Sequence, residues 1–231
     1  MVGEVTFVVR SHRLIHNIIL NMKTKISISR WISAFAIIVG SLIGGVAYVM
    51  SDDNIYTTEA IGRIEQFGDH YNYDTSYLIK LANTSPEAIR AYLSFTKMGE
   101  YTGDLSTEVY FVAALASIYT EDCGECVQLM VHMALEAGVS EDVVRGALQM
   151  GGSLSPDLEL VRRFATEIAT NNVSDNLHEQ MLEVHGEAAI ADLSICIASN
   201  RVYPAMKRAL GYGGTSCKVL DFDFKPLASK E

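Results

Sequence analysis

Apolar residues after residue 51 recur at helical spacing, and the segments they form begin and end at residues that favour helix boundaries. Ser85 and Ser155 are each followed by proline and an acidic residue, the order expected of a helix cap and first turn. Ser140 and Ser174 precede similar acidic first turns. We expect helices from these four serines, and further helices over residues 56–67, 75–83, 107–120, 123–137, 185–200 and 202–210. No strand is needed, so the pattern predicts an all-α fold.

The segment 107–120 differs from the other predicted helices because nearly every position in it is apolar. Its large side chains include Val109, Phe111, Leu115 and Ile118. A helix that is apolar on all sides has no face suited to water and is therefore buried. We expect this helix at the centre of the domain.

A second apolar run, residues 31–51, contains no charged residue and has no polar face. About twenty apolar residues in a helix span a hydrocarbon layer of about 30 Å, so we interpret the run as a single transmembrane helix. The alternative is a secretory signal with a small-x-small cleavage site at residues 45–47. The predicted organisation is a cytoplasmic segment 1–30, a membrane anchor or uncleaved signal 31–51, and a helical domain 52–231.

Charge sets the orientation of this anchor and narrows the choice of partners. Five basic residues precede the apolar run, and Asp52 and Asp53 follow it. The positive-inside rule then places the domain on the non-cytoplasmic side, periplasmic or extracellular. The chain carries a net charge of −10, and residues 52–231 hold 13 basic and 27 acidic side chains. Such a surface repels phosphate backbones and anionic lipids, so we expect no nucleic-acid partner and a membrane contact through the N-terminal helix alone.

The candidate chemistry is a Cys-x-x-Cys motif formed by Cys123 and Cys126, one helical turn apart at the start of a predicted helix. The chain has only four cysteines, which favours a working dithiol over a disulfide scaffold. A helix start lowers the pKa of a thiol, whereas the neighbouring carboxylates of Glu121, Asp122 and Glu125 disfavour the thiolate. We therefore expect a resting disulfide in an oxidising compartment, reopened by a dedicated donor. A static disulfide, two buried thiols and, less favoured, a zinc site are the alternatives.

Several motifs occur in a defined order around this pair: Leu105-Ser106, the apolar helix, Cys123-Gly-Glu-Cys126, Ala134-x-x-Ala137-Gly138-Val139, and finally His185-Gly186-Glu187-Ala188, Leu193 and Ala209-Leu210-Gly211. Over roughly residues 75–213, this combination resembles the carboxymuconolactone decarboxylase / alkylhydroperoxidase D-like (AhpD-like) family. The resemblance implies an all-helical fold and frequent trimeric or hexameric assembly. In members with the Cys-x-x-Cys motif it also implies peroxide reduction by the cysteine pair.

Two positions depart from the peroxidase pattern of that family, which places glutamate twelve residues before the first cysteine and histidine four after the second. Here these residues are Phe111 and Met130, which cannot move a proton but could pack as a sulfur–aromatic contact. Glu121 is the nearest plausible proton acceptor. His132 follows Cys126 by six residues, about 240° round the helix, and fits a surface or subunit contact better than a relay.

Other nucleophilic or titratable residues have simpler interpretations. His185 and Glu187 occur at a predicted helix start, where polar residues are common, with an acid–base role as the alternative. Cys196 lies in an apolar segment and is interpreted as a buried small hydrophobe. Cys217, in the glycine-rich tail, is expected to be exposed and could pair with another chain. Residues 101–137 contain no Lys or Arg to bind an anionic lactone acid, which disfavours decarboxylation.

These observations favour a thiol-dependent oxidoreductase with peroxiredoxin-type activity, in which one thiolate becomes a sulfenic acid and its neighbour condenses with it to a disulfide. The family resemblance favours Cys126 as the attacking sulfur, whereas the helix start favours Cys123. The expected partners are a peroxide or disulfide substrate, a thiol reductant and further copies of the chain, with no cofactor and no metal. The alternatives are a non-catalytic oligomeric scaffold with a structural disulfide, and a disulfide-exchange partner of another exported protein.

Overall fold

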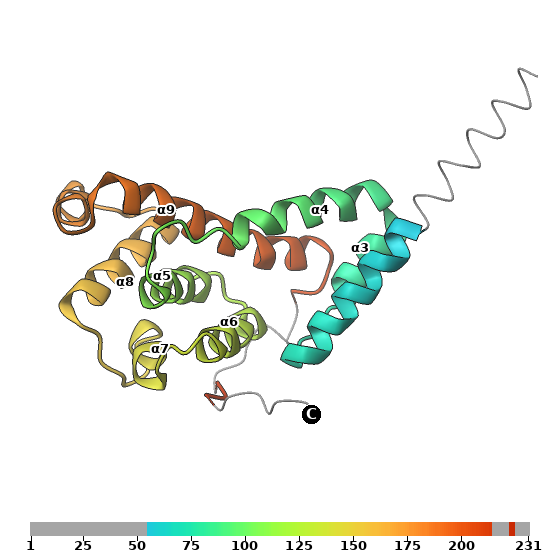
Figure 1. Ribbon diagram of the computed structural model, residues 1–231, viewed down its shortest axis with the longest axis horizontal. Coiled ribbons are helices and arrows are strands. Elements are labelled where there is room, and N and C mark those ends of the chain that lie inside the picture. Colours follow the sequence, from blue (N-terminus) through green and yellow to red (C-terminus); the bar gives the residue numbers. More distant parts are fainter. Residues whose placement is uncertain (1–54, 214–221, 225–231) are drawn as a thin grey trace, which may run out of the picture. The chain divides into compact units, whose positions relative to one another are not determined.

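The computed structural model describes residues 55–213 and 222–224, and all regular secondary structure among them is helical (Figure 1). The expectation of an all-α domain is confirmed. The predicted membrane anchor, residues 31–51, lies outside the described residues. In the part of the chain that is described, no helix combines the length and the apolar character needed to cross a membrane.

The described part begins with a helix over residues 55–71. Seven further helices follow within it: α3 (Ser76–Thr84), α4 (Pro86–Gly99), α5 (Thr107–Tyr119), α6 (Gly124–Glu136), α7 (Glu141–Ala147), α8 (Pro156–Ala169) and α9 (Asp175–Ala209). The hydroxyl oxygens of Ser85, Ser140, Ser155 and Ser174 each accept a hydrogen bond from the backbone N–H three residues later. The four predicted serine starts are therefore confirmed, and each cap is worth about 1 kcal/mol.

Two predicted helix boundaries are wrong. The first helix continues through Gly68 to residue 71. Gly68 leaves room for a close approach of the backbone, because a Cβ there would lie 2.9 Å from the carbonyl oxygen of Tyr73. α9 continues through Arg201, where a break was expected, and Pro204 lies inside it. The boundary expected between the helix from Ser174 and the helix over 185–200 is confirmed by a break at Gly186, with φ 79° and ψ 170°, a conformation that only glycine adopts readily.

α5 lies at the centre of the main core, as its apolar sequence predicts. Its residues 110–118 are all buried, and it contacts α6, α7, α8 and α9 (Figure 1). Phe222 and Phe224, far along the chain, also belong to this core. A second, smaller cluster joins the first helix to α3 and α4 through side chains that include Ile64, Leu78 and Ile89. The junction between α5 and α6 carries the Cys-x-x-Cys motif, so the most buried helix of the domain leads directly into it.

Candidate functional site

Cys123 and Cys126 are joined by a disulfide across the start of α6, with their Cα atoms 5.2 Å apart. Cys123 is the N-cap residue of α6, and Cys126 lies in its first turn. Only 1% of Cys123 and 3% of Cys126 are exposed to solvent. The expected bonded pair is present, and a reagent can reach its sulfur atoms only after neighbouring groups move.

The turn between α5 and α6 sets the position of the disulfide. Asp122 has φ 51°, in the left-handed region that aspartate tolerates better than most residues, and its side chain is exposed. α5 ends at Tyr119, and α6 already starts at Gly124, so the turn that carries Asp122 is short. The Cys123 side chain makes no capping hydrogen bond, so it does not offset the partial positive charge at the start of α6.

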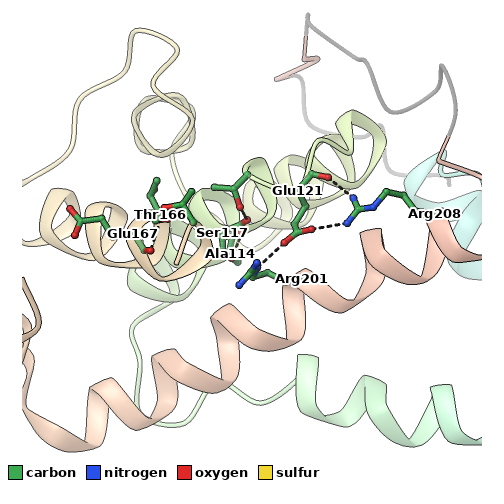
Figure 2. Close-up of polar contacts among 9 residues, drawn as sticks. Ala114, Ser117, Glu121, Thr166, Glu167, Arg201 and Arg208 are labelled. Atoms are coloured by element: carbon green, nitrogen blue, oxygen red, sulfur yellow. Dashed lines mark hydrogen bonds and ion pairs between the residues drawn. The ribbon is translucent and has the colours of Figure 1, made fainter. Parts of the chain in front are cut away.

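Glu121 is held by two arginines of α9, as Figure 2 shows. Its Oε1 accepts a hydrogen bond from Nε of Arg201 at 2.7 Å, and its Oε2 accepts one from Nη2 of Arg208 at 2.8 Å. Nη1 of Arg208 also donates to the backbone oxygen of Glu121 at 2.6 Å. Burial alone would raise the pKa of Glu121, but the hydrogen bonds from Arg201 and Arg208 bring it below its ordinary value. A carboxylate so occupied is a weak base, which favours an anchoring role over the proton-acceptor role considered from the sequence.

Glu125, which lies between the two cysteines, is also paired with α9. Lys207 Nζ donates a hydrogen bond to Oε2 of Glu125. The Lys207 side chain is only 1% exposed, and that of Glu125 is 26% exposed. The ammonium nitrogen also lies 5.0 Å and 5.6 Å from the ring centroids of Tyr73 and Tyr77, within the range of cation–π attraction.

These ion pairs change the electrostatic argument drawn from the sequence. That argument treated the carboxylates near the cysteines as uncompensated, whereas two of the three, Glu121 and Glu125, are paired with cations. A paired charge repels a nearby thiolate far less than a free one. The expectation that the site disfavours a thiolate therefore loses most of its support.

The three cations Arg201, Lys207 and Arg208 were missed as site residues by the sequence analysis. One signal could have pointed to them. Residues 101–137 contain no Lys or Arg, so the acidic residues beside the cysteines have to find partners elsewhere in the chain. Arg201 and Arg208 are seven residues apart and share one face of α9, which is the spacing expected for two cations that bind one carboxylate.

His132 is buried, with 8% of the residue exposed, and not at the surface as expected. Its Nε2 accepts a hydrogen bond from Nε2 of Gln128 at 2.8 Å. The same amide of Gln128 donates to the carbonyl oxygen of Asp223 at 2.7 Å and accepts from the Asp223 N–H at 2.8 Å. The proton of the neutral imidazole then lies on Nδ1, which is buried and has no hydrogen-bond partner within residues 55–213 and 222–224. Gln128 thus links His132 to the C-terminal segment through hydrogen bonds to both.

The remaining candidate residues divide into core and surface positions. Phe111 and Met130, which stand at the two relay positions of the family pattern, are both buried in the main core. Neither side chain can transfer a proton. Burial raises the pKa of Cys196 to about 12, in agreement with its interpretation as a small core hydrophobe. His185 is half-buried, and Glu187 is exposed.

Cys217 lies outside the described residues. Within those residues, no group of three or more His, Cys, Asp or Glu side chains is placed to hold a metal ion. No family model, curated protein or solved structure matches the chain. Membership of the AhpD-like family therefore stays a prediction from the sequence motifs, and the chemistry has to be argued from the site itself.

Proposed function

We propose that this protein is a thiol-dependent oxidoreductase of the AhpD-like kind that reduces peroxides through Cys123 and Cys126. The observation that carries the proposal is the disulfide across the first turn of α6. A loop of four residues gains about 2 kcal/mol from its disulfide in the chain-entropy model, against about 4.7 kcal/mol for a loop of 100 residues. The apolar core of the helical domain, and not this bond, then supplies most of the stability. Such a bond can open and close while the domain stays folded.

The described disulfide corresponds to the oxidised end of the proposed cycle. A thiol reductant opens it by exchange and leaves with its own disulfide, which gives two free thiols. One thiolate then attacks an oxygen of the peroxide, becomes a sulfenic acid and releases an alcohol or water. The second thiol condenses with the sulfenic acid, expels water and restores the disulfide. The dithiol supplies both electrons, and the peroxide accepts them.

The geometry at the start of α6 supports Cys123 as the attacking sulfur. As the N-cap residue it lies where the unpaired N–H groups of the first turn favour a negative charge. The carboxylates of Glu121 and Glu125 on either side are neutralised by cations of α9. A thiolate at this position therefore gains from the helix and loses little to its acidic neighbours.

A second candidate is a structural disulfide in a non-catalytic oligomeric scaffold. The burial of both sulfur atoms favours it, because redox-active cysteines are normally accessible. A cysteine pair that exchanges its disulfide with another exported protein would also have to be accessible, so burial counts against that role as well. The accessibility of the reduced pair therefore separates the redox proposals from the scaffold.

The test is to reduce the full chain, remove the reductant, add hydrogen peroxide or an organic hydroperoxide, and follow each cysteine by mass spectrometry. The proposal expects loss of the Cys123 and Cys126 thiols far faster than free cysteine reacts, and one alcohol formed per disulfide when the substrate is an organic hydroperoxide. Cys196→Ser is the matched control, because it removes a thiol outside the motif and should leave the rate unchanged. In Cys126→Ser, a trapped sulfenic acid on Cys123 identifies the attacking sulfur. Rates no better than those of free cysteine would leave the scaffold as the better explanation.

A further inference from the structure

Glu125 creates an electrostatic difficulty for a dithiol at this position. It is adjacent in sequence to Cys126 and two residues from Cys123, in the first turn of the same helix. A unit charge about 8 Å from a thiol shifts the thiol pKa by about 1.5 units at an effective dielectric constant of about 20. An uncompensated carboxylate here would therefore lower the fraction of reactive thiolate in the reduced pair at neutral pH.

Lys207 supplies the compensation from the far end of α9, 82 residues along the chain from Glu125. Its ammonium group is removed from solvent and makes contact with one carboxylate and two aromatic ring faces. Taking a lysine out of water is expensive, and replacing a buried ion pair by apolar residues is often neutral or stabilising. A gain in fold stability alone is thus a weak explanation for placing a buried lysine beside the cysteine pair.

We propose that Lys207 is a positioning residue for the dithiol: it holds the Glu125 carboxylate and cancels its charge, so that a thiolate can form at the start of α6. This inference rests on the proposed function, since ionisation matters only for thiols that react. The other charged groups near the cysteine pair do not neutralise Glu125 in place of Lys207. Arg201 and Arg208 are committed to Glu121, and Asp122 adds a further negative charge on the exposed side of the turn.

The proposal makes predictions of opposite sign for the two members of the pair. In Lys207→Met, the unopposed Glu125 carboxylate should raise the thiol pKa by about one unit. In Glu125→Gln, the Lys207 ammonium keeps only its electrostatic attraction to Asp74, so it should lower the thiol pKa, by less than about one unit. In the double variant both charges are gone, and the thiol pKa should return to within a few tenths of a unit of the unmodified protein. Lys207→Arg keeps the charge and should stay close to the parent value.

The measurement is the pH dependence of alkylation of Cys123 and Cys126 in the reduced full chain, read for each cysteine by mass spectrometry. Lys97→Met is the matched control, because it removes an exposed lysine in the last turn of α4 and should not change either value. If the pair were merely structural, the thiol pKa would move in the same direction in both single variants or would not move in either. That result would overturn the proposal. If Lys207→Met fails to fold, Glu125→Gln decides alone: an unchanged or raised thiol pKa refutes the assignment.

Alkylation does not involve peroxide, so the two proposals fail separately. Opposite pKa shifts in a protein that ignores peroxide would refute the peroxidase function and leave the effect of Lys207 on the thiols standing. Fast peroxide reduction with no pKa shift in either single variant would refute the role of Lys207 and leave the function standing.

Discussion

Reducing the Cys123–Cys126 disulfide should weaken the domain slightly without unfolding it. The bond closes a loop of four residues. In the chain-entropy model such a loop removes about 6.2 cal/mol/K of entropy from the unfolded chain, which amounts to about 1.9 kcal/mol at 25 °C. The two thiols stay buried as small apolar groups, so we expect no large additional loss. The free energy of unfolding should fall by about 2 kcal/mol on reduction.

The assay is urea unfolding of the full chain, followed by helical circular dichroism with and without a non-thiol reductant. With a slope of about 2 kcal/mol/M, the midpoint should fall by about 1 M while the transition stays single and the slope is unchanged. A variant with alanine at both Cys123 and Cys126 is the control, since its midpoint should not respond to reductant. Loss of the cooperative transition on reduction would refute the reasoning, because the bond would then hold the fold together.

Three further predictions concern residues outside the disulfide. Glu121→Gln should lower the free energy of unfolding by about 1–2 kcal/mol at pH 7, between the values for exposed and buried ion pairs. The pKa of Glu121 is lowered in the folded state, so the carboxylate stabilises the fold fully only above its unfolded-state pKa. The difference in stability between Glu121→Gln and the parent should therefore shrink as the pH falls through the folded-state pKa, and urea titrations across pH 2–7 would measure it. Gly186→Ala should lower the free energy of unfolding, measured in urea, by about 1–3 kcal/mol. The cause is the backbone conformation alone, since a Cβ at Gly186 meets nothing within 4 Å. Gly62→Ala is the control: a Cβ there is equally free of contacts but lies within a helix, so this change should stabilise the domain. Gln128→Ala should speed hydrogen exchange at the Asp223 amide, which loses its acceptor; unchanged exchange would contradict this docking of the C-terminal segment.

The sequence was sufficient for those features of the fold that depend on neighbouring residues. Helix caps act within one turn, so Ser85, Ser140, Ser155 and Ser174 could be recognised without knowledge of the fold. The burial of α5 follows from its own composition, because no arrangement could satisfy an apolar helix at the surface. The break at Gly186 was expected one residue earlier, at His185, whereas the break expected at Arg201 is absent and the helix continues through Pro204.

The site was predicted only in part because its electrostatics depend on residues far apart in the chain. Glu121 pairs with residues 80 and 87 positions later, and Glu125 with one 82 positions later. No periodicity within one segment encodes such a pairing. The docking of Asp223 on Gln128, at a separation of 95 residues, was missed for the same reason.

The ion pairs on either side of Cys123 bear directly on how the reduced pair would behave. Glu121 before it and Glu125 after it are both bound to the last turns of α9, so the turn is held at two points by contacts that do not involve sulfur. Opening the disulfide removes neither contact. We therefore expect the two thiols to stay close after reduction, so that the condensation that restores the bond requires little loss of chain entropy. A redox cycle needs this property, whereas a disulfide that served stability alone would gain nothing from it.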